Sequence, residues 1–67
     1  MGLRRLLNRQ GMTLAEAARR ARVSSQTVHN WRARPQTATA GPLGTLAKVL
    51  GVSVDELLRE LREDAKS

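Results

Sequence analysis

Two short helical segments joined by a tight turn constrain this chain more than any other feature. They lie within residues 13–32, which read TLAEAARRARVSSQTVHNWR. Thr13 and Glu16 are three residues apart and form a capping-box pattern, which predicts the start of a helix at Thr13. The apolar residues of this helix recur at helical spacing, and most are small: Leu14, Ala17, Ala18 and Ala21. A second helix can therefore approach this segment, predicted over residues 13–21, closely.

The second helix is predicted to begin at Ser24 or Ser25, since either is a good N-cap, and to end at Arg32. Val28 and Trp31 are three residues apart and form its inward pair. The outward residues are polar and can hydrogen-bond a base edge or a phosphate: Ser25, Gln26, Thr27, His29 and Asn30. An ordinary solvated helix would favour Glu and Lys at these positions. The spacing of the two segments is typical of a DNA-reading helix-turn-helix.

A further helix is predicted before this motif. Leu3, Leu6 and Leu7 recur at helical spacing, so we expect a helix over about residues 3–9 that Gly11 ends. After the motif, residues 32–42 read RARPQTATAGP, which predicts an irregular loop. Pro42 suits the first position of the next helix, and Gly51 stops it.

The last helix is predicted to begin with a second capping box, formed by Ser53 and Glu56. Its apolar spacing continues through Val54, Leu57, Leu58 and Leu61 into an acidic, frayed tail over about residues 62–67. We expect Val54 and Leu57 to close the core, with Leu61 as a further candidate for it. Either Leu58 or Leu61 is then left over as an apolar contact for a second copy. The prediction is an all-α fold of five short helices in a single domain, residues 1–67.

Composition narrows the function classes. The chain has no cysteine and one histidine, His29, so we expect no disulfide and no metal site. There is no cysteine nucleophile, no phosphate-cradling glycine loop and no carboxylate pair in a plausible cleft, so we expect no enzyme, cofactor or small-molecule ligand. No apolar run approaches the roughly 20 residues of a membrane span, and a cytoplasmic setting fits. A binding function remains.

Charge is spread unevenly along the chain. Residues 1–50 hold nine Lys or Arg and a single acidic residue, Glu16, whereas residues 51–67 hold three basic and five acidic residues. The basic part contains the motif. A surface of this sign attracts polyanions, which makes nucleic acid the natural partner.

The chain resembles the lambda-type phage repressor and Cro family of helix-turn-helix DNA-binding domains. The resemblance covers about residues 3–61 and rests on LAEAA at 14–18, VSSQTV at 23–28 and LAKVLGVSVDEL at 46–57. It implies five helices, a second motif helix in the major groove and a dimer on a palindromic operator. The family commonly has glycine in the motif turn where this chain has Arg22, so we expect the turn to be slightly reshaped. It also often has glutamine where Leu14 stands, so backbone N–H groups or arginines must hold a phosphate there.

Candidate site residues follow from the outward face and the resemblance. Base contacts are predicted for Ser25, Gln26, His29 and Asn30, and Gln26 is the sharpest candidate because its amide can pair bidentately with adenine. Phosphate contacts are predicted for Thr13, Arg22, Ser24, Thr27, Arg32 and Arg34. Dimer contacts are predicted for Leu58 and Leu61.

The sequence therefore predicts a sequence-specific regulator that binds double-stranded DNA, a small repressor acting as a homodimer. A different class also fits the motif, namely a protein-interaction module such as the antidote half of a toxin pair, whose acidic partner would satisfy the same arginines. A basic amphipathic helix protein on anionic membranes fits less well, because the apolar faces are narrow and are needed for the core.

Overall fold

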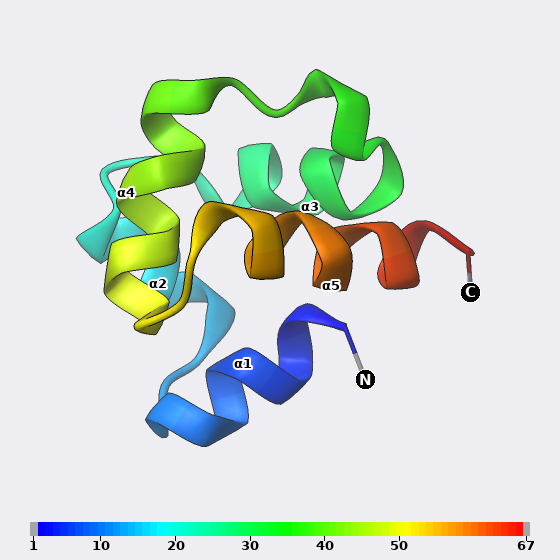
Figure 1. The fold of residues 1–67 in the computed structure, drawn as a ribbon. Helices are drawn as coiled ribbons and strands as arrows, with labels where there is room; N and C mark the ends of the chain where they lie inside the picture. Colours follow the sequence, from blue (N-terminus) through cyan, green and yellow to red (C-terminus); the bar gives the residue numbers. More distant parts are fainter. Residues whose placement is uncertain (1, 67) are drawn as a thin grey trace.

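The computed structural model describes residues 2–66, and helices make up most of this part of the chain. The elements are α1 (Leu3–Gln10), α2 (Leu14–Arg20), α3 (Ser25–Ala33), the 3₁₀ helix η1 (Pro35–Thr37), α4 (Ala40–Leu50) and α5 (Val54–Lys66) (Figure 1). Residues 2–66 contain no strand. The predicted all-α fold with five short α-helices is confirmed.

Two glycines end helices as their positions predict. At Gly11 (φ 65°) the backbone N–H donates to Asn8 O, and the next N–H, of Met12, donates to Leu7 O, both at 3.1 Å. Gly51 (φ 70°) ends α4 with the same pair of bonds, one residue and two residues past the helix. This is the Schellman arrangement, in which a left-handed residue turns the chain back and satisfies the last carbonyls.

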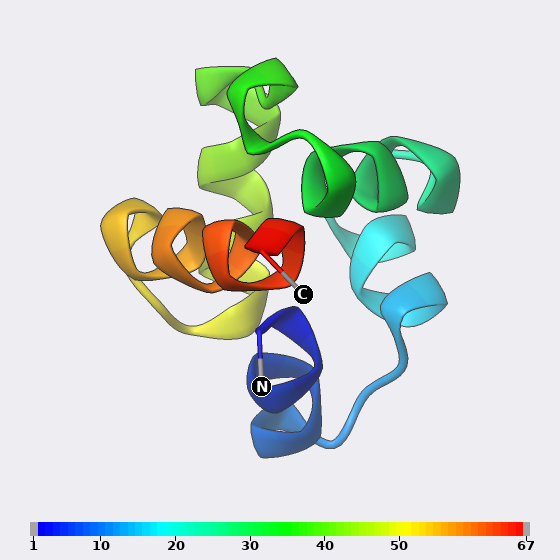
Figure 2. The ribbon, with the colours of Figure 1, turned by 90° about the vertical axis from the view of Figure 1, so that its right-hand side faces the viewer.

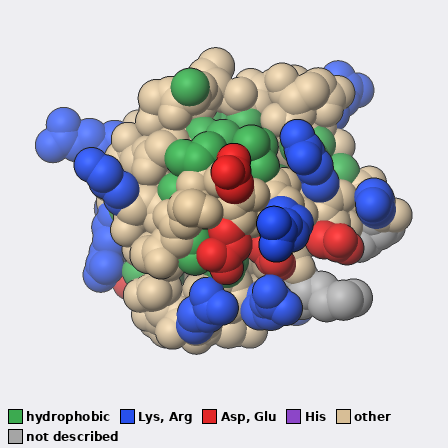
Figure 3. Space-filling model, viewed as in Figure 1, with side chains coloured by type: hydrophobic (Ala, Val, Ile, Leu, Met, Phe, Trp, Pro, Cys, Tyr) green, Lys and Arg blue, Asp and Glu red, His purple; other side chains and the backbone are tan. Residues whose placement is uncertain are grey.

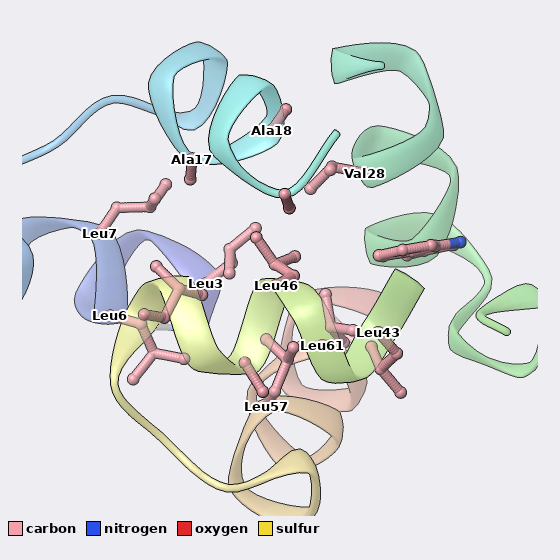
Figure 4. Packing of buried hydrophobic residues seen from close by; sticks show 14 residues of the cluster. Leu3, Leu6, Leu7, Ala17, Ala18, Val28, Leu43, Leu46, Leu57 and Leu61 are labelled. Atoms are coloured by element: carbon pink, nitrogen blue, oxygen red, sulfur yellow. The ribbon is translucent and has the colours of Figure 1, made fainter. Parts of the chain in front are cut away.

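The core draws side chains from all five α-helices, and Figure 4 shows ten of them labelled around α4. The buried apolar residues are Leu3, Leu6, Leu7, Ala17, Ala18, Ala21, Val28, Trp31, Leu43, Leu46, Ala47, Leu50, Leu57 and Leu61. The alanines of α2 are among them, and α2 packs against α1, α3 and α4. The small side chains of α2 therefore lie at its contacts with neighbouring helices, as predicted.

The motif helices lie on one side of the molecule. In Figure 2, α2 and α3 form the right-hand side, while α4 and the first part of α5 lie to the left. α5 crosses the molecule and packs against α1, α3, α4 and η1. In this arrangement α5 packs against one side of α3, and the other side of α3 is not covered by any part of residues 2–66.

The segment between α3 and α4 differs from the predicted irregular loop. Pro35 begins the short 3₁₀ helix η1, and α4 starts at Ala40, two residues before Pro42. Pro42 is therefore the third helical residue rather than the first. The first intrahelical bond of α4 runs from Leu43 N to Thr39 O at 2.9 Å, so no hydrogen bond is lost at Pro42.

The predicted frayed tail is wrong within the described residues, because α5 is helical to Lys66. Asp64 fixes this last turn: its Oδ2 accepts from Leu3 N at 2.9 Å and from Arg32 Nε at 3.1 Å. The predicted tail residue Ser67 lies outside the described residues. The Ser53 hydroxyl accepts from Glu56 N at 3.1 Å as predicted, but the Glu56 carboxylate pairs with Arg9 at 3.6 Å rather than completing a capping box.

The core side of α5 also differs from the prediction. Val54 is 38% exposed, whereas Leu57 and Leu61 are fully buried and close the core. Leu61 lies one turn after Leu57, on the side of α5 that faces the other helices. The predicted dimer contact at Leu61 is therefore wrong, because this side chain is not accessible. Leu58 is half-buried and remains a candidate.

Candidate nucleic-acid interface

The start of α2 is built by the predicted capping box. Glu16 N donates to Thr13 Oγ1 at 3.1 Å, and Thr13 N donates to Glu16 Oε1 at 3.2 Å. Both groups stand at the exposed start of the helix. The single acidic side chain of residues 1–50 thus accepts a hydrogen bond from the backbone N–H of Thr13.

The motif turn adopts the glycine-type conformation without a glycine. Arg22 has φ 61°, and it is the only residue other than glycine with positive φ among the described residues. Arg22 N donates to Arg19 O at 3.1 Å and Val23 N donates to Ala18 O at 3.0 Å, which is the same Schellman pair found at Gly11 and Gly51. The expected reshaping of the turn does not occur. The arginine instead accepts a backbone strain of about 1–2 kcal/mol.

Ser24 rather than Ser25 is the N-cap of α3. Its hydroxyl oxygen accepts from Thr27 N at 3.0 Å and lies 2.7 Å from Thr27 Oγ1. Ser25 is half-buried. The hydroxyls of Ser24 and Thr27 are thus held together at the exposed start of the helix, beside N–H groups that have no intrahelical acceptor.

The uncovered face of α3 carries three of the predicted base-contact residues. Gln26, His29 and Asn30 are exposed, whereas Val28 and Trp31 are buried on the opposite side. Gln26 Nε2 donates to Asn30 Oδ1 at 3.2 Å, so the two amides are linked across one turn. Of the four predicted base contacts, only Ser25 lies off this face.

Ala33 shares this face and was missed by the sequence analysis. It is exposed and follows Gln26 by seven residues and Asn30 by three, which places all three on one helical stripe. The helix was predicted to end at Arg32, and only polar residues were considered as readers. The i, i+4, i+7 spacing would have found Ala33, whose methyl group can contact the methyl group of thymine.

Arg32 lies on the other side of α3. It follows Val28 by four residues, so it shares the inward face, and its Nε donates to Asp64 Oδ2 on α5. Its side chain is 32% exposed. The predicted phosphate contact is not supported at this position. In the monomer, the position of Arg32 on the helix lets its side chain join α3 to α5.

Arg34 follows α3 and is exposed. Its carbonyl oxygen accepts from Thr37 Oγ1 at 2.7 Å, which ties the end of α3 to η1. A surface pocket beside it is lined by Asn30, Ala33, Arg34 and Thr37. The arginine therefore stands at the end of the stripe that Gln26, Asn30 and Ala33 form.

Ion pairs divide the arginines into two groups. Arg5, Arg9 and Arg32 pair with carboxylates of α5: Glu60 at 3.3 Å, Glu56 at 3.6 Å and Asp64 at 3.1 Å. Within residues 2–66, the exposed arginines of α2, the turn and the end of α3 form no ion pair: Arg19, Arg20, Arg22 and Arg34. The acidic residues of α5 thus neutralise two arginines of α1 and one of the motif, Arg32, and the other four leave the motif positive.

The arrangement defines an all-α domain with a basic helix-turn-helix and an uncovered polar stripe on its second helix. A helix-turn-helix family profile matches residues 3–57. The chain belongs to this family, of the lambda repressor and Cro type, and is a DNA-binding helix-turn-helix regulator. The family is a regulatory one and not an enzyme family. Comparison with curated proteins and with solved structures gave no match.

Among residues 2–66, no helix is long and apolar enough to cross a membrane. In the same part of the chain, no three His, Cys, Asp or Glu side chains gather where they could hold a metal ion.

Proposed function

We propose that this chain is a sequence-specific transcriptional repressor that places α3 in the major groove of duplex DNA. The observation that carries the proposal is the exposed face of α3. On this face Gln26, His29 and Asn30 offer amide and imidazole groups, and no acidic side chain lies among them. Such groups match the donors and acceptors on base edges. Occupancy of an operator would itself block the polymerase.

Phosphate contacts would come from the start of α2, the turn and the two ends of α3. Thr13, Arg22, Ser24, Thr27 and Arg34 lie at these places, and all but the half-buried Thr27 are exposed. Lysine, arginine, hydroxyl and backbone N–H groups at helix starts are the usual phosphate partners in such complexes. Arg32 is left out of this set because Asp64 holds it.

We further propose a homodimer through the exposed flank of α5. A surface pocket there is lined by the half-buried Leu58, by Pro35 of η1 and by Arg62, Ala65 and Lys66 of α5. Figure 3 shows hydrophobic side chains gathered on this face with charged side chains around them. Asp55 lies in the first turn of α5 and Lys66 is its last residue, so an antiparallel pair of α5 helices brings opposite charges together.

The size of the domain is compatible with a palindromic operator. Its principal extents are 24 × 22 × 20 Å. Each extent is shorter than one turn of duplex, about 34 Å, so two neighbouring copies can place their α3 helices at the spacing of successive major grooves without overlapping.

The direct test is selection of bound sequences from a random duplex pool, followed by footprinting on the enriched duplex. We expect two inverted half-sites about 10–10.5 base pairs apart, both protected together. Enrichment of no sequence would refute sequence-specific binding. Absence of any duplex binding at low salt would favour the protein-interaction class instead, since that class needs no polyanion affinity.

A further inference from the structure

Gln26 and Asn30 are joined by a side-chain hydrogen bond on the face of α3 that residues 2–66 leave uncovered. Gln26 Nε2 donates to Asn30 Oδ1 at 3.2 Å, and both residues are exposed. Surface glutamines ordinarily keep both amide donors in water. Here one donor already has a protein partner before any DNA is present.

The bond changes what Gln26 can offer to a base. A glutamine amide has two N–H donors and one carbonyl oxygen. With one N–H directed to Asn30, a single N–H and the carbonyl oxygen remain for a bidentate contact. The major-groove edge of adenine needs one donor at N7 and one acceptor at its amino group, whereas guanine presents two acceptors and needs two donors. The engaged amide therefore matches adenine and not guanine.

The bond also fixes the orientation of the amide. The terminal torsion of glutamine is broad and nearly two-fold, so a free amide can present its nitrogen and oxygen in either order. Asn30, one turn further along the same face, holds the nitrogen toward the C-terminal end of α3. A group fixed in advance loses less conformational freedom on binding, so the contact becomes both tighter and more selective.

We propose that Asn30 is a positioning residue that fixes the Gln26 amide for adenine, so that the two residues read one base pair as a unit. This rests on the proposed function, in which α3 lies in the major groove. The role differs from that of an independent base contact, because Asn30 acts at the base pair that Gln26 touches.

The test uses the duplex that the intact chain enriches from a random pool. The base pair read by Gln26 is the one at which Gln26→Ala loses its preference, and four duplexes then carry each base pair at that position. The intact chain should prefer adenine over guanine there by about 5- to 150-fold, the equivalent of about 1–3 kcal/mol. Asn30→Ala should reduce this ratio to less than threefold. Asn30→Asp, which keeps the acceptor oxygen, should retain the ratio while weakening binding to all four duplexes.

Asn8→Ala is the matched control, because Asn8 is an exposed asparagine on α1. It should leave the ratio unchanged. An Asn30→Ala variant that keeps the adenine preference at this position, or loses preference at a different base pair, would overturn the positioning role. If Gln26→Ala alters no base preference at all, the proposed placement of α3 fails instead, and the two failures are thereby distinguished.

Discussion

Arg22 holds a backbone conformation that costs an L side chain free energy. Its φ of 61° lies beside those of Gly11 (65°) and Gly51 (70°), and all three residues occur in the same helix-ending bond pattern. Arg22→Gly should remove a strain of about 1–2 kcal/mol, partly offset by the roughly 0.4–1 kcal/mol of extra freedom that glycine gives the unfolded chain. We expect a net gain of about 0.5–1 kcal/mol, seen as a rise of about 2–8 °C in Tm by circular dichroism.

Gly11→Ala is the matched control for this prediction. Nothing lies within 4 Å of a Cβ built at Gly11, so the substitution tests the left-handed conformation without a steric clash. It should lower the Tm. If Arg22→Gly fails to raise the Tm while Gly11→Ala lowers it, the Arg22 side chain contributes a compensating contact to the fold.

Residues that read the base sequence should differ in their mutational effects from residues that only contact the DNA backbone. Gln26→Ala should weaken binding to the enriched duplex by about 1–3 kcal/mol and leave random duplex nearly unaffected. Arg34→Ala should weaken both and reduce the slope of log affinity against log salt by about 0.9, the contribution of one phosphate contact. Fluorescence anisotropy at several salt concentrations measures both quantities.

Arg32→Ala is the informative comparison, because it removes the same charge only two residues away, in the last turn of α3. Arg32 is held by Asp64, so its loss should change the salt slope by much less than the loss of Arg34 does. Equal changes in slope for the two variants would mean that Arg32 leaves Asp64 to contact DNA. A Gln26→Ala variant that loses affinity equally for enriched and random duplex would show that Gln26 does not read bases.

The candidate site was predictable where helical phase decides it and not elsewhere. Gln26, His29 and Asn30 are exposed because Val28 and Trp31 fix the buried side of the helix, and that pair is visible in the sequence. The ion pair of Arg32 with Asp64 was not predicted, although the spacing of four residues from Val28 places Arg32 toward the inward side of the helix. The contacts themselves with DNA stay predictions.

At the scale of helices, Asp64 ties three elements together. This carboxylate of α5 accepts from the first N–H of α1 and from an arginine in the last turn of α3, and its side chain is 13% exposed. Asp64→Ala should lower the free energy of unfolding by about 1–2 kcal/mol, because it leaves a partly buried N–H unsatisfied and removes a charged bond. Urea unfolding, followed by the fluorescence of Trp31 in α3, measures this change in the free energy of unfolding.

Glu56→Ala provides the contrast for Asp64. Its ion pair with Arg9 joins side chains that are 36% and 54% exposed, and exposed pairs contribute about 0–1 kcal/mol. We expect a loss well below that of Asp64→Ala. Equal losses would indicate that Asp64 acts through the general charge of α5 rather than through its two specific donors.

Helix starts and stops were predictable where a local side chain or glycine sets them. The Thr13 cap and the stops at Gly11 and Gly51 depend only on neighbouring residues. The end of α5 was not predictable in this way, since Asp64 finds its partners 61 and 32 residues away in sequence. The start of α4 was misplaced because proline is tolerated throughout the first turn and so does not mark a single position.

For the whole molecule, substitutions at Leu58 and at Leu61 should distinguish dimer formation from the stability of the monomer. Leu58→Asp should abolish the proposed dimer and leave the free energy of unfolding of the monomer within about 1 kcal/mol, because this side chain is only half-buried. Leu61→Ala should cost about 2–5 kcal/mol by opening a cavity in the core. That is a large share of the stability of a small domain.

Sedimentation across a range of protein concentrations, with and without the enriched duplex, checks the dimer part of this prediction. The intact chain should self-associate, and a duplex with one half-site should be bound less tightly than the palindrome. A Leu58→Asp variant that protects both half-sites with unchanged cooperativity would show that α5 is not the interface.

The hydrogen bond between Leu3 and Asp64 also makes it feasible to join the two ends of the chain and open it elsewhere. It brings the two ends of the described residues together, and Figure 1 shows them on the same side of the molecule. A short linker can therefore join the ends without crossing the fold, and new ends can be opened at exposed Thr39, between η1 and α4. A circular permutant of this kind would start with α4 and finish just after α3 and η1. The DNA-reading unit could then be fused to another domain directly behind its reading helix.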